Sequence, residues 1–283
     1  MKNSIVVGYD GSAQSRTALE WAVAQAMLEH RTLHLVHCWI WPLFTDDLGP
    51  VEGVADSGLR HAAEAIVAEG EAEARRLAPE LDLKASLISG VSSAILDRMS
   101  RNAHLVVVGS RGLGGFMGLL VGSVSLKLAN TASCPVVVVR QQTDATGSVL
   151  IGLDGSPKSD TALDDAIALA ALWKAPLKLM HVRDDIRLFG RNHSYPGSDV
   201  RAMQILAAAA LRARTAAPGV EIESVLVTGH SVAGTILEAA ESARIVVVGE
   251  TGQGNFMGAV GSTAQAILHH AKGNILISRR PRT

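Results

Sequence analysis

Apolar and polar positions follow a regular order along the chain, in which short apolar runs alternate with longer stretches of helical periodicity. The run Ile5 to Gly8 leads into "SRTALEWAVAQAMLEH", and the apolar "LHLVHCW" comes next. Asp10 and Ser12 lie between the first two and offer side-chain oxygens that cap a helix. Wholly apolar runs predict strands that are buried on both faces. Such strands alternating with helices predict a parallel sheet between two helix layers.

The same order continues to the middle of the chain. A helix is expected around residues 58–78, where the glutamates mark a solvated face, and "LKASLIS", "SSAILDRMSR" and "HLVVVG" predict a strand, a short helix and a strand. After a glycine-rich loop come a helix, "SVSLKLANTA", and a closing strand, "PVVVVR". Ligands of such open sheets bind at the carboxyl ends of the strands, near the point where strand order reverses. Asp10 and the loop at Gly109 both follow strands and are therefore expected to converge.

The second half of the chain repeats the first. "VVVGSRGLGGFMGLLVGS" at residues 106–123 returns as "VVVGETGQGNFMGAVGS" at 246–262, one residue shorter, and "VVGYDGS" near the start returns as "LIGLDGS". Repeat units of this length are whole domains, because solenoid repeats are far shorter. The polar "QQTDATGS" is the natural linker. We therefore expect two domains, residues 1–142 and 147–283.

Composition narrows the class of protein. Of the 283 residues, 48% are hydrophobic and 19% are charged, and the net charge is −1, which gives no basic field for nucleic acid. Cys38 and Cys134 form no metal or redox spacing, and no apolar stretch is long enough to cross a bilayer. The start, "MKNSIVVGYDGS", passes directly into a strand pattern without the apolar region of a signal peptide. A cytoplasmic protein without a membrane or nucleic-acid partner is expected.

The glycine-rich loop has the chemistry of a phosphate cradle. It begins Gly109-Ser110-Arg111-Gly112 and, nine residues later, ends Gly122-Ser123 at the start of a helix. Glycines allow a ligand to approach the backbone, and a helix N-terminus offers unpaired amides and a favourable dipole for an anion. Asp10 could accept hydrogen bonds from a ribose or a base.

Other interpretations of this loop are open or excluded at this point. It is not a Walker A loop, because no Gly-Lys-Ser/Thr follows. The dinucleotide fingerprint belongs to the first strand-to-helix turn, which here is "GYDGS" and lacks it. A flexible glycine turn without a ligand remains an alternative, because isolated glycine motifs often match by chance.

The combination of Gly-x-Asp-Gly-Ser, Gly-x2-Gly-x9-Gly-Ser and a closing apolar strand resembles the universal stress protein family, and both halves of the chain carry it. The resemblance implies the adenine nucleotide alpha hydrolase-like α/β fold: two tandem open parallel five-stranded sheets of order 3-2-1-4-5 with helices on both faces. It also implies that ATP, with Mg²⁺ held through the phosphates, binds at the loop. Residues expected to bind nucleotide in the first half are Gly8, Asp10, Val36, Gly109, Ser110, Arg111, Gly112, Leu113, Gly114, Gly115, Gly122, Ser123 and Val124.

The second half departs from this pattern. Glu250 replaces Ser110, and the loop from Gly252 to Gly261 is shorter, which is expected to displace the helix start and weaken the phosphate contacts. A carboxylate beside a phosphate repels it unless it is paired or a metal intervenes. The expected second-half binding residues are Gly152, Asp154, Gly249, Thr251, Gly252, Gly261, Ser262 and Thr263.

No catalytic constellation is recognisable in the sequence, because neither a base that positions water nor a Walker B acid can be identified. The resemblance implies an ATP-binding regulator of the stress response with an unknown protein partner. Related single-domain proteins dimerise through their last strands, so a tandem chain is expected to make this contact between its own halves, and a further homodimer is also expected. The alternatives are a slow ATPase or nucleotidyl-transfer enzyme, and an interaction scaffold whose pockets are empty.

Overall fold

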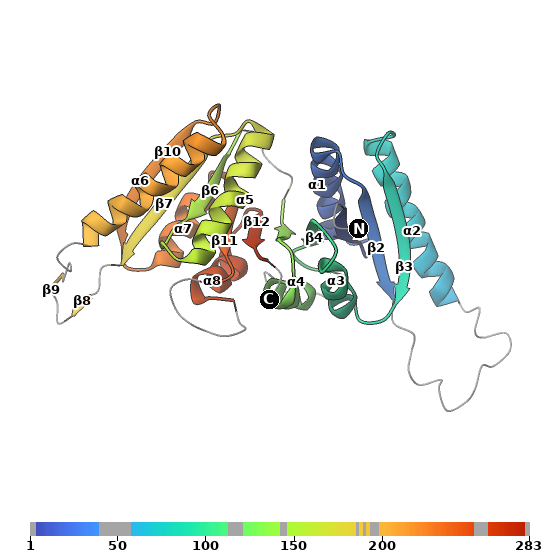
Figure 1. The fold of residues 1–283 in the computed structure, drawn as a ribbon. Helices are drawn as coiled ribbons and strands as arrows, with labels where there is room; N and C mark the ends of the chain where they lie inside the picture. Colours follow the sequence, from blue (N-terminus) through green and yellow to red (C-terminus); the bar gives the residue numbers. More distant parts are fainter. Residues whose placement is uncertain are drawn as a thin grey trace. The chain divides into compact units, whose positions relative to one another are not determined.

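The computed structural model describes residues 4–39, 58–112, 121–141, 146–184, 187–188, 191–192, 198–251 and 260–280. The chain divides into two compact units, Met1–Gln142 and Thr143–Arg280. Within each unit, strands and helices alternate along the chain, and helices cover both faces of a parallel five-stranded sheet (Figure 1).

The first unit runs from β1 to β5. Its strands are parallel and hydrogen-bond in the order β3-β2-β1-β4-β5. Helices α1 and α2 pack on one face of the sheet, and α3 and α4 pack on the other. The elements are β1 (Ile5–Gly8), α1 (Ala13–Glu29), β2 (Leu33–Trp39), α2 (Gly58–Leu77), β3 (Leu83–Ser89), α3 (Ser92–Ser100), β4 (Leu105–Gly109), α4 (Ser123–Thr131) and β5 (Val136–Val139).

The second unit repeats this plan in the order β10-β7-β6-β11-β12, with α5 and α6 on one face and α7 and α8 on the other. The short antiparallel pair β8–β9 between β7 and α6 is an addition that the sequence pattern did not predict. The elements are β6 (Ser148–Gly152), α5 (Pro157–Trp173), β7 (Leu177–Asp184), β8 (Arg187–Leu188), β9 (Arg191–Asn192), α6 (Ser198–Ala216), β10 (Ile222–Gly229), α7 (Val232–Ala240), β11 (Ala243–Gly249), α8 (Ser262–His270) and β12 (Ile275–Ser278).

The central strands form the core of each unit. All four residues of β5 are buried, and so are the first three of β1, as expected for strands covered on both faces. The outer strands β3 and β10 are mostly half-exposed. The predicted fold class, two tandem parallel five-stranded sheets of order 3-2-1-4-5 with helices on both faces, is confirmed.

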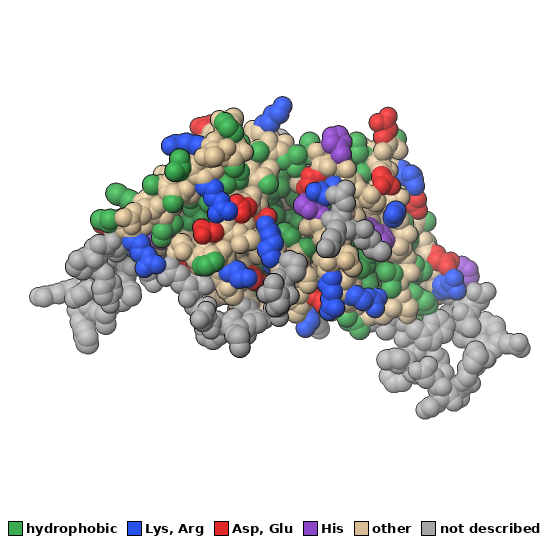
Figure 2. Space-filling model, in the orientation of Figure 1, with side chains coloured by type: hydrophobic (Ala, Val, Ile, Leu, Met, Phe, Trp, Pro, Cys, Tyr) green, Lys and Arg blue, Asp and Glu red, His purple; other side chains and the backbone are tan. Residues whose placement is uncertain are grey.

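Helix α2 turns a charged face to solvent. Arg60 pairs with Glu64 and Arg75 pairs with Glu71, each at 2.9 Å and each one helical turn apart. Figure 2 shows acidic and basic side chains intermixed over exposed helix surface. The expectation that the glutamates of this helix are solvated is confirmed. Within the described ranges, none of the helices combines the length and apolar character that crossing a bilayer requires.

Candidate functional site

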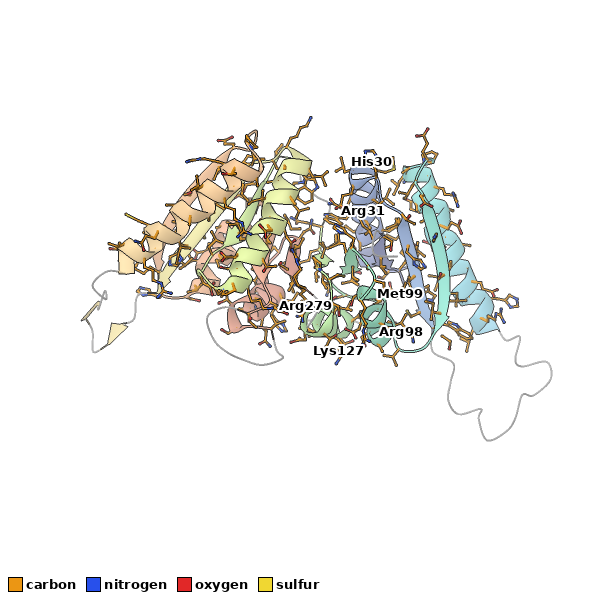
Figure 3. The ribbon with its side chains drawn as sticks, in the orientation of Figure 1. His30, Arg31, Arg98, Met99, Lys127 and Arg279 are labelled. Carbon is orange, nitrogen blue, oxygen red and sulfur yellow. The ribbon has the colours of Figure 1, made fainter. Side chains whose placement is uncertain are left out.

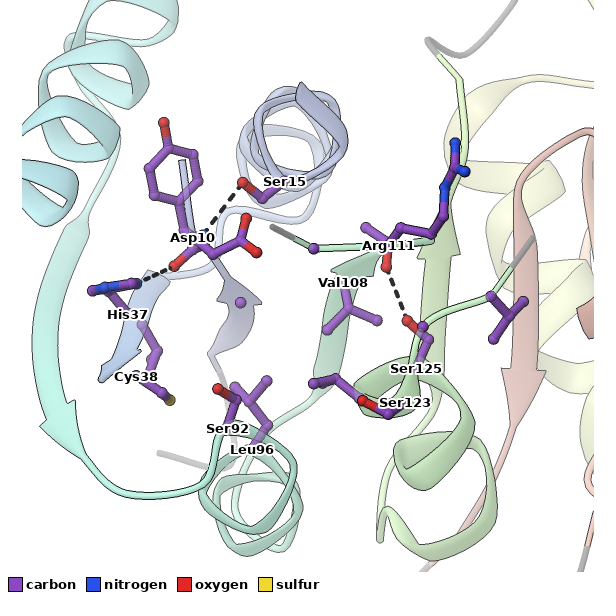
Figure 4. Close-up of a pocket in the computed structure, with 18 residues that line it drawn as sticks. Asp10, Ser15, His37, Cys38, Ser92, Leu96, Val108, Arg111, Ser123 and Ser125 are labelled. Atoms are coloured by element: carbon purple, nitrogen blue, oxygen red, sulfur yellow. Dashed lines mark hydrogen bonds between the residues drawn. The ribbon is translucent and has the colours of Figure 1, made fainter. Parts of the chain in front are cut away.

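A cavity of about 520 Å³ opens at the carboxyl ends of β1, β2 and β4 in the first unit. The strands β2 and β4 flank β1 on opposite sides, so the cavity lies where strand order reverses, which is the usual ligand position in open α/β sheets. Its volume falls within the roughly 300–1,000 Å³ that is typical of small-molecule sites. Figure 4 shows side chains from β2, α3, α4 and the β1–α1 turn around it.

Most residues predicted for the first half lie together around this cavity. Ser110 does not line it, because it is buried directly behind the loop. Leu113, Gly114 and Gly115 lie outside the described residues. The predicted residues that line the cavity are Gly8, Asp10, Val36, Gly109, Arg111, Gly112, Gly122, Ser123 and Val124.

Helix α4 begins at the cavity without a side-chain cap. Its N-cap is Gly122, which makes no side-chain hydrogen bond, whereas the N-cap of α1, Ser12, accepts a hydrogen bond from the amide of Ser15. The first amides of a helix have no partner within the helix and carry partial positive charge. Because Ser123 and Val124 line the cavity, the start of α4 is arranged to receive an anion there.

Two hydrogen bonds fix this helix start on the end of β4. The amide of Gly122 donates to the carbonyl oxygen of Ser110 at 2.7 Å, and Ser125 Oγ donates to the carbonyl oxygen of Gly109 at 2.9 Å (Figure 4). The two described ends of the glycine loop are therefore held together.

Asp10 faces the glycine loop from the end of β1. Its Oδ1 accepts hydrogen bonds from the amide of Ser12 at 3.0 Å and from Ser12 Oγ at 2.6 Å, which hold the carboxylate in one orientation. Its Oδ2 lies so close to Gly112 that a Cβ at that residue would overlap it. Gly112 is thus a glycine because Asp10 occupies the space of a side chain.

The glycines of the motif serve two different purposes. A Cβ at Gly109 would lie 2.8 Å from the backbone of Gln14 in α1, so glycine there permits close packing of helix on strand. A Cβ at Gly122 would meet its nearest atoms only at 3.4 Å, and the φ of −81° suits any residue. Packing within the unit therefore does not explain glycine at position 122.

The opposite end of the cavity is less polar. Val36, His37 and Cys38 approach it from β2, and Leu96 approaches it from α3. His37 Nδ1 lies 2.8 Å from the carbonyl oxygen of Tyr9; a carbonyl only accepts, so Nδ1 carries the proton. Burial raises the pKa of the Cys38 thiol to about 11, so it is a neutral, weakly polar group at neutral pH.

Two arginines lie near the end of the cavity that is formed by the glycine-rich loop and the start of α4. Arg111 lines the cavity, and Arg140 follows β5 directly beside Ser110, whose amide donates to the carbonyl oxygen of Val139 at 2.9 Å. Burial, and then the charge of Arg111, lower the pKa of Arg140 to about 10. Arg140 is therefore still cationic at neutral pH.

The second unit repeats the local geometry at equivalent positions. Asp154 Oδ1 accepts from the amide of Ser156 at 2.9 Å, and His181 Nδ1 donates to the carbonyl oxygen of Leu153 at 2.7 Å. The N-cap of α8 is Gly261, again without a side-chain cap. Of the other predicted residues, Gly152 and Gly249 end β6 and β11, Ser262 and Thr263 begin α8, Thr251 follows Glu250, and Gly252 lies outside the described residues.

The shorter loop does not displace the helix start. The amide of Gly261 donates to the carbonyl oxygen of Glu250 at 2.7 Å, the same length as the equivalent bond between Gly122 and Ser110. The expectation that the start of α8 shifts relative to the end of β11 is not supported.

Glu250 also differs from the expectation of an unpaired carboxylate. One of its oxygens contacts Lys158 Nζ, and the other lies 2.9 Å from Arg279 Nη2. The side chain of Glu250 is 12% exposed, and that of Arg279 is 1% exposed. Two cations therefore neutralise this carboxylate within the unit itself.

Several cavity residues escaped the sequence reasoning. Tyr9 lines the cavity from the variable position of the Gly-x-Asp-Gly-Ser motif, and Ser15, Cys38, Ser92 and Leu96 line it from a strand or helix outside the motifs. Only topology brings the latter four to the site. The described residues also contain no cluster of three or more His, Cys, Asp or Glu side chains placed to hold a metal ion.

The fold and the site together define a tandem α/β protein in which each unit joins its fourth strand to an uncapped helix through a glycine-rich loop. The model of the universal stress protein family matches residues 1–140 and 146–279, almost the whole chain. The chain therefore belongs to the universal stress protein family and carries one family domain in each half.

Comparisons with individual proteins agree. A universal stress protein of Mycolicibacterium smegmatis is 31% identical over 290 residues, covering 97% of this chain and 96% of the relative. One of Mycobacterium tuberculosis is 30% identical over 295 residues, with 99% and 97% covered. A universal stress protein from Archaeoglobus fulgidus shares the fold with a TM-score of 0.74 at 19% identity, covering 99% of both chains.

Proposed function

We propose that the first unit binds ATP and that the protein acts as a nucleotide-dependent regulator in the stress response. One observation carries this proposal: the uncapped start of α4 faces the oriented carboxylate of Asp10 at a cavity of about 520 Å³. An anion suits the helix start and a hydroxyl suits the carboxylate. A nucleotide carries both groups on one molecule.

The lining residues supply a place for each part of ATP. The amides of Ser123 and Val124, the hydroxyl of Ser123 and the guanidinium of Arg111 would hold phosphate oxygens. Asp10 would accept hydrogen bonds from ribose hydroxyls. The base would lie against the less polar end formed by β2 and Leu96. Mg²⁺ is proposed to accompany the phosphates and to neutralise part of their charge.

The cellular setting is also part of the proposal. Cys38 and Cys134 are both free thiols, which suits a reducing cytoplasm. We expect a homodimer and a protein partner that distinguishes the nucleotide-bound chain from the empty one. Neither a membrane nor a nucleic-acid partner is expected. The residues predicted for the second unit, from Gly152 to Thr263, are proposed to bind adenine nucleotide more weakly than the first unit.

Two alternative functions, an enzyme and an interaction scaffold, differ from this proposal in the fate of the nucleotide. A slow ATPase or nucleotidyl-transfer enzyme would use the same cavity but would turn the nucleotide over. An interaction scaffold would leave the cavity empty. Both differ from a binder in what happens to the nucleotide, and that difference can be measured directly.

The test begins with mass spectrometry of small molecules released when purified, full-length protein is denatured. ATP is expected from the wild-type chain and much less from Gly122→Leu, whose side chain would project into the cavity in front of the first amides of α4. Gly122→Ala is the matched control for changes at the N-cap. Absence of nucleotide, together with no binding of added ATP–Mg²⁺, would establish the scaffold. Stoichiometric ADP formation during incubation would instead establish the enzyme.

A further inference from the structure

The side chains around Glu250 in the second unit form a closed ionic cluster, which we call the Glu250 cluster: Glu250, Lys158 and Arg279. We propose that this cluster sets the ligand preference of the second unit, which favours adenosine and binds ATP only weakly. The inference rests on the proposed nucleotide binding and adds to it the residue that decides which nucleotide each unit accepts.

The cluster lies where a phosphate chain would begin. The carbonyl oxygen of Glu250 accepts from the amide of Gly261, the N-cap residue of α8, so Glu250 is bonded to the helix start that would receive a phosphate. Its carboxylate pairs with Lys158 in the first turn of α5 and with Arg279, the residue that follows β12 and is labelled in Figure 3. The internal carboxylate thus already occupies the two cations that an incoming phosphate would need.

The first unit carries different charges at the same positions. Serine at 110 replaces Glu250, glutamine at 14 replaces Lys158, and Arg111 stands where the second unit has threonine. When Arg140 and Asp10 are counted as well, these positions of the first unit hold two arginines and one carboxylate, a net charge of +1. The equivalent positions of the second unit hold two cations, Lys158 and Arg279, and two carboxylates, Glu250 and Asp154. Their net charge is zero.

This difference acts on the phosphates and not on the nucleoside. A triphosphate in the second unit would have to compete with Glu250 for Arg279, whose side chain is only 1% exposed. It would also lie beside the carboxylate, and like charges repel strongly where solvent is excluded. Asp154 and His181, the equivalents of Asp10 and His37, lie outside the cluster. Recognition of adenosine is therefore retained.

The test compares ATP and adenosine on the full chain, with Gly122→Leu and Asp10→Ala present throughout, because the first blocks the phosphate contacts of the first unit and the second removes its ribose contact. Glu250→Gln keeps the shape and an acceptor for Arg279 but removes the negative charge. It is expected to raise ATP affinity of the second unit roughly tenfold, the size of one charge-assisted hydrogen bond, and to leave adenosine affinity within about twofold. Glu241→Gln, which removes an exposed carboxylate of the same unit, is the matched control and should change neither.

A reciprocal variant covers the case in which Glu250→Gln fails to fold. Ser110→Glu, in the otherwise wild-type chain, should lower ATP affinity of the first unit roughly tenfold while adenosine binding stays. The inference would be wrong if either variant changed the affinities for ATP and adenosine equally, or if neither variant changed the affinity for ATP. The proposed function would survive this result as long as ATP still binds the first unit of the wild-type chain. Failure of both ligands to bind either unit of the wild-type chain would overturn the inference together with the proposed function.

Discussion

The two units close their glycine loops with the same hydrogen bond and differ in the charge of the residue that makes it. Ser110 and Glu250 both accept from the amide of the helix N-cap at 2.7 Å. One carries a neutral side chain, and the other carries a carboxylate paired with Lys158 and Arg279. Retention of the motif glycines therefore preserves the loop framework without preserving its electrostatics. Charge next to the motif, more than loop length, is expected to separate the two units.

The two units also differ in the contact between their first helix and their last strand. In the first unit, Trp21 and Val139 are buried apolar residues at these positions. In the second, Asp165 accepts from Ser278 Oγ at 2.5 Å and pairs with Arg280 at 2.7 Å. The second unit is thus stabilised by polar and ionic contacts where the first relies on apolar burial.

The largest expected effect separates the two units by ligand binding. Gly122→Leu should lower ATP affinity of the first unit by at least about a hundredfold, because the side chain enters the cavity and blocks the α4 amides. This corresponds to roughly 3 kcal/mol. Gly261→Leu should leave the tight site unchanged and remove only the weak one. Isothermal calorimetry of each variant measures this, and a tight site that survives in Gly122→Leu would refute the assignment of the cavity.

A smaller effect, on stability, is expected to distinguish Gly109, which helix packing requires, from Gly122, which we propose a ligand requires. Gly109→Ala should destabilise the first unit by about 1–3 kcal/mol, because its Cβ would meet the backbone of Gln14. Gly122→Ala should cost less than about 0.5 kcal/mol. Urea unfolding of both variants tests this, and equal losses of stability would mean that Gly122 is also a packing residue.

The ionic contact at β12 offers a comparison between two adjacent aspartates. Asp165→Asn should lower the free energy of unfolding by about 1–2 kcal/mol, because Asp165 is largely buried and bonded to both Ser278 and Arg280. Asp164→Asn should cost less than about 0.5 kcal/mol, because the pair of Asp164 with Arg212 is exposed. Thermal unfolding at low and high salt checks both, and indistinguishable variants would argue against a stabilising role for Asp165.

The smallest effect concerns Glu29, at the end of α1. Burial raises the pKa of Glu29, but hydrogen bonds from His104, Gln25 and Arg31 outweigh it and hold the pKa below its ordinary value. A lowered pKa in the folded state stabilises the protein above the unfolded-state pKa. That contribution disappears as the pH falls through the folded-state value.

Glu29→Gln should therefore cost about 1 kcal/mol at neutral pH, and the difference from wild type should shrink as the pH falls below the ordinary value of 4.5. In the second unit, Trp173 takes the position of Glu29. Its ring centroid lies 4.0 Å from the guanidinium of Arg244, so this contact contains no carboxylate. Trp173→Leu should show no such acid dependence. A pH-independent cost in Glu29→Gln, measured by unfolding between pH 3 and 7, would contradict the ionic role of Glu29.

Much of the fold followed from the sequence because its signals are local. Apolar runs such as Ile5 to Gly8 can only be buried strands in a chain of this composition, and the internal repeat predicts the second unit from the first. The pair β8–β9 was missed because its four residues carry no apolar alternation.

The site was predictable only where a motif marks it. The loop and Asp10 were found from their spacing, whereas Cys38 and Leu96 reach the cavity through strand order and helix packing. The pairing of Glu250 was missed for the same reason: Lys158 and Arg279 are distant in sequence, and only the fold brings them to one carboxylate. Gly109 was interpreted as a ligand glycine, although contact with Gln14 also requires it.

The difference between the two units can be measured most directly by calorimetric titration of nucleotide-free, full-length protein with ATP–Mg²⁺. We expect two unequal sites, with dissociation constants at least about tenfold apart, and the tighter one absent from Gly122→Leu. Two identical sites, or a tighter site that disappears in Asp154→Ala or Gly261→Leu, would contradict the assignment of ATP to the first unit.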